Sequence, residues 1–170
     1  MAPVARTAHL IARFVETVPA RPPDAEDEVW AAEQLEPAEW AVWSRLADTD
    51  RRHLVQVARE VENTPAALEH RWLIRAALLH DIGKGEAEIG VVGRVAATLI
   101  DPLLPSSSWL RSRLKGRIGR YLRYPDSGAR LLTELGSPPP VVAWAREHHL
   151  GPAHWTIAHD AGVALAHADG

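Results

Sequence analysis

Several residue types are missing or scarce in this chain, and each absence excludes a class of chemistry or structure. There is no cysteine among the 170 residues, which excludes disulfides, thiolate metal sites and a cysteine nucleophile together. There are only one Phe and two Tyr, and β-branched residues rarely alternate with polar ones, so the composition predicts helices rather than strands. Any chemistry must therefore come from His, Asp and Glu side chains.

A strong net charge and a long apolar run are also lacking. The formal charge is −3 and the pI is near 6.3, so nothing points to nucleic acid or an anionic membrane surface as the main partner. Arg6 and Arg13 interrupt the apolar stretch near the N-terminus, which therefore does not fit a secretory signal. The apolar runs elsewhere are far shorter than a bilayer span. We expect a cytoplasmic protein that does not enter a membrane.

The length predicts one all-α domain, a single compact helical bundle around one core. We expect residues 1–47 to form an N-terminal helical extension packed on a core domain of residues 48–170. A helix that opens at Pro37 carries Trp40, Trp43 and Leu46 on one stripe. Apolar periodicity and Gly or Pro breaks predict further helices over residues 6–18, 48–62, 66–79, 89–100, 109–124, 125–135, 141–149 and 153–168.

The clearest chemical signal is the stretch LLHDIGKG at residues 78–85. A wholly apolar helix end delivers the imidazole of His80 and the carboxylate of Asp81 side by side, before a glycine turn that leaves Lys84 on a short arm. Burying an unpaired carboxylate costs several kcal/mol, as rough penalties suggest, and a cation would offset that cost. The alternative, in which the pair binds no metal, is that His80 caps its helix while Asp81 faces solvent.

A second His-Asp pair provides an internal comparison. His159 and Asp160 lack both the preceding apolar run and the following Gly-Lys-Gly. We interpret this pair as part of a solvated helix face rather than as metal ligands. The apolar helix and the glycine turn therefore distinguish the first pair.

With these residues the chain resembles the HD superfamily, over roughly residues 48 to 169. The family pattern is a His on one helix, a His-Asp pair that ends another, and a distant Asp on a late helix. The matching residues are His53, then His80 and Asp81, then Asp169. The resemblance implies that these four hold a divalent ion, with Asp160 as the alternative late carboxylate. By itself, His53 would be interpreted as an ordinary, partly buried histidine.

The resemblance also implies an activity. Two imidazoles and two carboxylates form a mixed N/O site that suits Mn²⁺, Fe²⁺, Co²⁺, Ni²⁺, Zn²⁺ or Mg²⁺. In the family, such an ion binds a phosphoryl oxygen and activates water. We therefore expect a metal-dependent phosphohydrolase acting on a small phosphorylated substrate such as a nucleotide, with Asp81, Lys84 and His148 as catalytic residues. Lys84 and His148 are expected to stabilise charge on the phosphate.

Two later segments resemble the HD-GYP subgroup, whose metal centres are more elaborate, but they depart from its pattern. Tyr124 stands where that subgroup has a His, and the pair His148 and His149 is followed by Leu-Gly-Pro rather than by the Gly-Tyr-Pro signature. We therefore do not expect a complete two-metal centre or cyclic dinucleotide cleavage. The His pair either lines the site or simply caps a helix end in contact with solvent.

Two other functions stay open at this stage. One is a catalytically degenerate HD-like sensor that binds a nucleotide or a protein partner, and the other is a purely structural helical domain without an ion. The basic segment over residues 109–124 is expected to be a solvated face, with a phosphate-binding rim as the alternative. The seven tryptophans are expected to anchor the core rather than to stack on bases.

Overall fold

The structure is a computed structural model that describes residues 22–87 and 124–170, with side chains at 22–84 and 124–170. In these ranges the regular elements are helices and there is no strand, which confirms the predicted all-α class. None of these helices is long and apolar enough to cross a bilayer. The helices predicted over 6–18, 89–100 and 109–124 fall outside the described ranges, apart from Tyr124. The α-helices are α2 (Ala25–Gln34), α3 (Pro37–Trp43), α4 (Asp48–Glu62), α5 (Pro65–Glu69), α6 (Leu73–Leu79), α10 (Tyr124–Glu134), α11 (Pro139–Glu147) and α12 (His159–Asp169).

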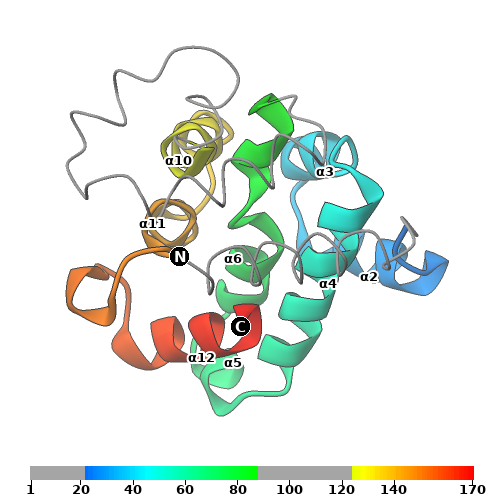
Figure 1. Cartoon of the computed structure of the whole chain (residues 1–170). Helices are drawn as coiled ribbons and strands as arrows, with labels where there is room; N and C mark the ends of the chain where they lie inside the picture. The colour runs from blue at the N-terminus through cyan, green and yellow to red at the C-terminus, as the bar shows by residue number, and fades with distance from the viewer. Residues whose placement is uncertain (1–21, 88–123) are drawn as a thin grey trace, which may run out of the picture. The chain divides into compact units, whose positions relative to one another are not determined.

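Helix α6 is the centre of the compact unit formed by residues 21–86 and 124–170. It contacts α2, α4, α5, α11 and α12, and Figure 1 shows it between α4 and α11. Because α6 is apolar on almost every side, it is stable only when other helices surround it. Ala31, Trp43 and Leu46 are buried in the same hydrophobic core, so residues on both sides of position 47 build it. The domain boundary at 47 stays a prediction.

Helix α4 is amphipathic, and its polar side binds α2. Leu54, Val57 and Val61 are buried on its inner face, as the i, i+3, i+7 spacing predicts. The guanidinium of Arg59 lies 3.1 Å from Asp27 and stacks 3.7 Å from the ring centre of Trp30. Residues 1–47 were expected to form a helical extension, but no bounds were predicted for a helix in the acidic segment between residue 24 and Pro37. This segment forms α2, because acidic residues in its first turn suit a helix N-terminus and because arginines of α4 bind it.

The helix predicted over residues 66–79 is instead two helices, α5 and α6. The backbone leaves helical geometry at His70, where φ is −120° and ψ is 86°. Helix α5 buries none of its residues, whereas five of the seven residues of α6 are buried. The turn between them lets the apolar second half enter the core while the exposed first half stays at the surface.

The last predicted helix begins later than expected. Residues 152–154 form only a 3₁₀ turn, η3 (Pro152–His154), and α12 begins at His159 rather than at Ala153. The intervening loop is fixed by Glu147, whose carboxylate accepts hydrogen bonds from the backbone N–H and the hydroxyl of Thr156, both at 2.7 Å. A buried carboxylate that binds the loop backbone in this way competes with continuing the helix.

A buried carboxylate also ties α3 to its neighbours. Glu39 is fully buried and accepts hydrogen bonds from Nε of Arg75 on α6 at 2.7 Å and from the hydroxyl of Ser137. It also accepts the backbone N–H of Glu36 at 3.1 Å, the reciprocal bond of a capping box. Because its charge is paired and its oxygens are satisfied, Glu39 can be buried and still fix the position of α3.

Candidate metal centre

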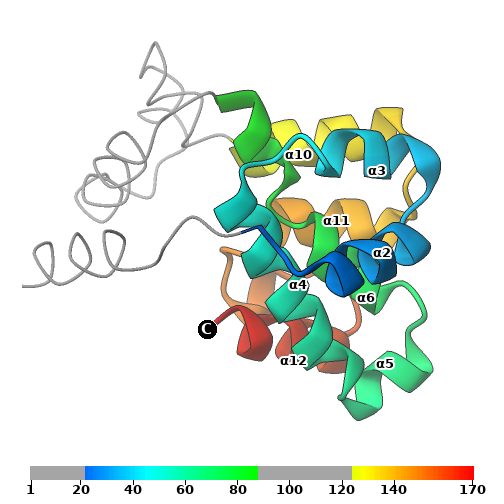
Figure 2. The same cartoon turned by 90° about the vertical axis from the view of Figure 1, so that its right-hand side faces the viewer.

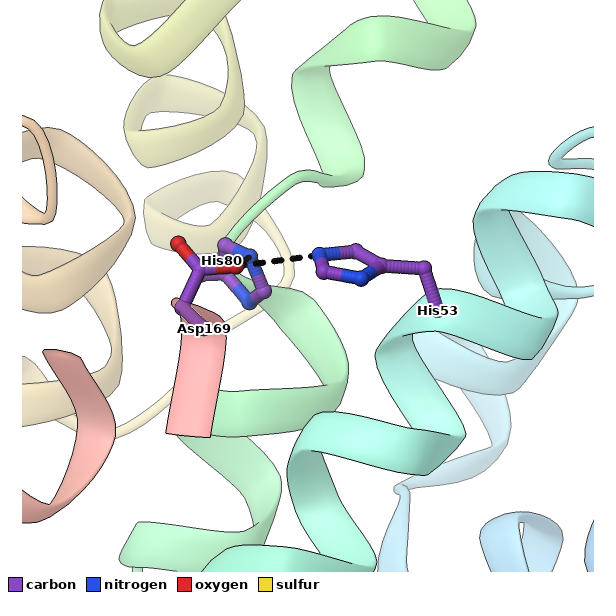
Figure 3. Close-up of side chains that lie close together, drawn as sticks. All are labelled: His53, His80 and Asp169. Carbon is purple, nitrogen blue, oxygen red and sulfur yellow. Dashed lines mark hydrogen bonds and ion pairs between the residues drawn. The ribbon is translucent and has the colours of Figure 1, made fainter. Parts of the chain in front are cut away.

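Three helices deliver the side chains predicted to hold an ion. Helix α4 carries His53, His80 is the C-cap of α6, and Asp169 is the last residue of α12 (Figure 3). The Nε2 atom of His53 lies 3.0 Å from Oδ1 of Asp169, and Nε2 of His80 lies 3.4 Å from the same oxygen. Their ligand atoms all lie within 4.8 Å of one another. Two metal bonds of about 2.0 to 2.2 Å allow ligand atoms up to about 4.4 Å apart. The distances of 3.0 and 3.4 Å from Asp169 to the two imidazoles lie within that limit, so they suit one shared ion.

The tautomer of His80 turns a lone pair toward this site. Its Nδ1 lies 2.8 Å from the carbonyl oxygen of Ala77 in the preceding turn, so Nδ1 must carry the proton and donate it. The Nε2 atom is then an acceptor that faces two carboxylates, Asp169 at 3.4 Å and Asp81 at 3.7 Å. Metal-binding histidines commonly have this arrangement, with the far nitrogen fixed by a backbone carbonyl.

Two buried polar atoms at this point lack hydrogen-bond partners among the described residues. They are Nε2 of His80 and Oδ1 of Asp81, and both residues are at most 3% exposed. Buried polar atoms are nearly always paired, so this acceptor nitrogen and this carboxylate oxygen are atoms that a bound cation could satisfy. The residues present therefore fit a bound divalent ion.

The titration behaviour of the group agrees with a need for positive charge. Burial by itself would lower the pKa of His80, but the carboxylates of Asp81 and Asp169 outweigh it and raise that pKa. Burial would raise the pKa of Asp169, yet contacts with His53 and His80 hold it well below its usual range. The site therefore stabilises ionised carboxylates and favours a nearby positive charge.

Asp81 lies beside this group but faces two other side chains. Its Oδ2 forms an ion pair with the ammonium of Lys84, and its Oδ1 lies 3.5 Å from Nε2 of His148. Burial would raise the pKa of Asp81, but the charges of His80 and Lys84 and the contact with His148 hold it well below the usual value. The structure thus brings together His53, His80 and Asp169, and places Asp81 between them and the predicted catalytic pair Lys84 and His148.

Close packing of two glycines sets the position of Lys84. Lys84 lies in the 3₁₀ helix η1 (Ile82–Ala87), and its ammonium is 5.2 Å from the ring centre of Tyr124 at the start of α10. A Cβ atom on Gly83 would lie 2.0 Å from the carbonyl oxygen of Tyr124, and one on Gly128 would lie 3.1 Å from the nitrogen of Gly83. The glycine after the His-Asp pair is therefore needed for this approach of η1 to α10.

The His pair after α11 has a hydrogen-bond partner that the sequence analysis did not assign. The hydroxyl of Tyr124 lies 3.1 Å from Nε2 of His148 and also bonds Nε2 of His149. His148 is buried and is the C-cap of α11, whereas His149 is exposed at the surface. Although His149 as a whole is exposed, burial of part of its imidazole and the nearby His148 lower its pKa to about 4. The sequence marked Tyr124 only as a departure from a family pattern, because nothing local indicates its contact with residues 24 and 25 positions later.

The second His-Asp pair lies elsewhere on the surface. His159 and Asp160 are both exposed, and Asp160 pairs at 3.0 Å with His70 from the end of α5. His70, Asp160 and the exposed Glu69 form a second close group of possible ligands, but solvent reaches them. A pocket of about 350 Å³ nearby is lined mainly by apolar side chains such as Trp72 and Ile157. None of the residues predicted to bind metal lines that pocket, and Asp169, not Asp160, lies beside His53 and His80.

Comparison with known proteins does not assign this site. No protein-family model, no curated protein and no solved structure matches the chain. The resemblance to the HD superfamily rests on the motif residues themselves, and three of the four predicted ligands have donor atoms that meet at one point.

Proposed function

We propose that this chain is a metal-dependent phosphohydrolase of the HD type that acts on a small phosphorylated substrate, such as a nucleotide. The observation that carries the proposal is the convergence of His53, His80 and Asp169 around a buried imidazole nitrogen that has no partner among the described residues. A divalent ion bound there would supply a Lewis acid for a phosphoryl oxygen and would lower the pKa of a water molecule toward neutrality.

In this proposal the ligands are His53, His80 and Asp169, with Asp81 as the fourth. Asp81 also positions two side chains, because one of its oxygens pairs with Lys84 and the other faces His148. Lys84 would bring positive charge to the phosphate, and His148 would add a polar group on the same side. The low pKa of Asp81 favours this role, since an ionised carboxylate holds the ammonium of Lys84 in place.

A second candidate function is a catalytically degenerate HD-like sensor that binds a nucleotide or a protein without turnover. The contacts of Tyr124 favour it, because this hydroxyl engages both His148 and His149 and thereby occupies imidazoles that catalysis could use. The two candidates share the metal and differ in turnover.

The purified chain should contain a divalent metal by elemental analysis. It should hydrolyse p-nitrophenyl phosphate, bis-p-nitrophenyl phosphate or a nucleotide when supplied with one of the ions named above. Asp81→Asn should abolish metal binding and activity together, because an uncharged amide neither attracts the ion nor pairs with Lys84. Asp160→Asn is the matched control, since it changes the carboxylate of the other His-Asp pair, and it should retain both.

The outcomes separate the candidates. Metal with turnover supports the hydrolase, and metal with tight nucleotide binding but no turnover supports the sensor. Full metal content in Asp81→Asn would count heavily against the proposed ligand set. A chain that never binds an ion would leave only a structural role for the site.

A further inference from the structure

A second group of imidazoles lies next to the proposed ligands, and a hydroxyl lies between its members. The group consists of Tyr124, His148 and His149. Nε2 of His148 is 3.1 Å from the phenol oxygen, and Nε2 of His149 bonds the same oxygen. Since Oδ1 of Asp81 is 3.5 Å from His148, two imidazoles and a carboxylate are near enough to be considered as further metal ligands.

The hydrogen bonds of this group can be assigned one proton at a time. Nδ1 of His148 faces the carbonyl oxygens of Trp144 and Ala145 at 3.3 and 3.2 Å, so it carries the proton and Nε2 is an acceptor. The Tyr124 hydroxyl is then the donor to that nitrogen. The phenol oxygen, in turn, accepts the N–H of His149.

The resulting chain runs from His149 at the surface through Tyr124 to the buried His148, and each nitrogen that faces the phenol has a partner. The contrast is with His80, whose Nε2 has no hydrogen-bond partner among the described residues. In the Tyr124 group each nitrogen that faces the phenol is therefore paired, whereas the neighbouring group contains the unpaired Nε2 of His80 beside His53, whose Nε2 contacts Asp169. An ion that recruited His148 would have to break its bond with the Tyr124 hydroxyl.

We propose that Tyr124 divides the histidines of this region into two sets, so that the site takes one divalent ion and His148 and His149 stay outside its coordination shell. The inference rests on the proposed function, because it assumes that His53, His80 and Asp169 bind that ion. Tyr124 is in this sense a positioning residue, because its hydrogen bond keeps the His148 imidazole facing Asp81 as a polar side chain rather than as a metal ligand.

The first test counts metal ions on the full chain. Metal-free protein is incubated with excess Zn²⁺, separated from free ion by gel filtration and measured by elemental analysis. The count is made in an Asp160→Asn background, which removes the exposed group that contains His70. We expect one ion per chain, one ion still in His148→Ala, and none in His53→Ala, whose half-exposed side chain makes it the safer variant to fold. Two ions in the parent chain, or loss of the ion in His148→Ala, would overturn the inference.

The second test does not need the metal. In ¹⁵N spectra of the imidazoles of the metal-free chain, Tyr124→Phe should shift the Nε2 signals of both His148 and His149 and leave His53 unchanged. Added Zn²⁺ should then shift His53 and His80 but not His148. If Tyr124→Phe moves neither imidazole, the proposed division is wrong. If the chain binds no ion but Tyr124→Phe still shifts the signals of His148 and His149, the proposed function is wrong. The contacts of Tyr124 with the two imidazoles would still stand.

Discussion

Two buried histidines in this protein are oriented in the same way by backbone carbonyls of the preceding helical turn. His80 uses the carbonyl of Ala77, and His148 uses those of Trp144 and Ala145. Each therefore presents Nε2 as an acceptor toward the carboxylate of Asp81 or Asp169. What differs is the next neighbour, because a tyrosine hydroxyl reaches one nitrogen and no described donor reaches the other. A single phenol oxygen thus separates a candidate ligand from a hydrogen-bonded side chain.

His149 should make the stability of the metal-free chain depend on pH. Its folded-state pKa is about 4, below the ordinary value of 6.5, so between these values the unfolded chain binds more protons. The stabilisation is present above pH 6.5 and is lost as the pH falls toward 4. We expect a loss of about 1 kcal/mol from this residue, a value discounted because solvent reaches the imidazole. Urea unfolding at pH 7 and pH 4.5 measures it.

The variant for this test is His149→Gln, whose amide N–H can still donate to the Tyr124 hydroxyl. The drop in unfolding free energy between pH 7 and pH 4.5 should be smaller in this variant than in the parent chain. His154→Gln, at an exposed site on η3, is the control and should keep the full drop. Equal drops in all three chains would contradict the assignment.

At the scale of elements, the site depends on how closely η1 approaches the start of α10. This approach places Lys84 beside Tyr124 and makes Gly83 a position where no side chain fits, since a Cβ atom there would overlap the Tyr124 carbonyl at 2.0 Å. The obstacle is backbone, which cannot rotate away as a flexible side chain can. The two elements would have to separate.

Gly83→Ala should therefore destabilise the fold by about 3 kcal/mol, the upper part of the usual cost of overpacking, and should weaken metal binding because Asp81 lies two residues earlier. The free energy of unfolding from urea titration checks this value. Gly151→Ala is the matched control, because a Cβ atom there meets nothing within 4 Å. A Gly83→Ala chain as stable as this control would show that η1 and α10 can move apart at little cost.

At the scale of the whole described unit, the candidate site joins helices that are distant in sequence. His53 and Asp169 are 116 positions apart, and α12 packs on α4, α5 and α6 (Figure 2). An ion bound by His53, His80 and Asp169 would link three of these helices in the folded state only. Metal binding and folding should therefore be coupled.

The melting temperature of the chain should rise when the proposed ion is added. At a free ion concentration about 100 times the dissociation constant, the folded state gains about 2.7 kcal/mol, which corresponds to several degrees for a chain of this size. Differential scanning calorimetry with and without a chelator measures the shift. Asp81→Asn should remove it and Asp160→Asn should retain it, while an equal shift in both variants would mean that the ion binds elsewhere.

Most of the fold class and several element limits could be predicted because they depend on local rules. The apolar spacing in α4, the start of α3 at Pro37 and the end of α10 near Gly136, whose φ is 76°, follow from helix periodicity and backbone sterics. The break at His70 and the bounds of helix α2 could not be predicted. Both depend on which surface is buried by helices from other parts of the chain.

The amino-acid sequence by itself predicted helices and excluded cysteine chemistry, and its resemblance to the HD superfamily predicted His53, His80, Asp81 and Asp169 as metal ligands. Only the tertiary structure decided that Asp169 rather than Asp160 lies beside the two histidines, that Lys84 pairs with Asp81, and that Tyr124 engages His148 and His149. The physical reason is the distance along the sequence over which each kind of interaction acts. Helix propensity and apolar spacing act over three or four neighbouring residues, whereas the meeting of side chains from α4, α6, α10, α11 and α12 depends on how whole helices pack.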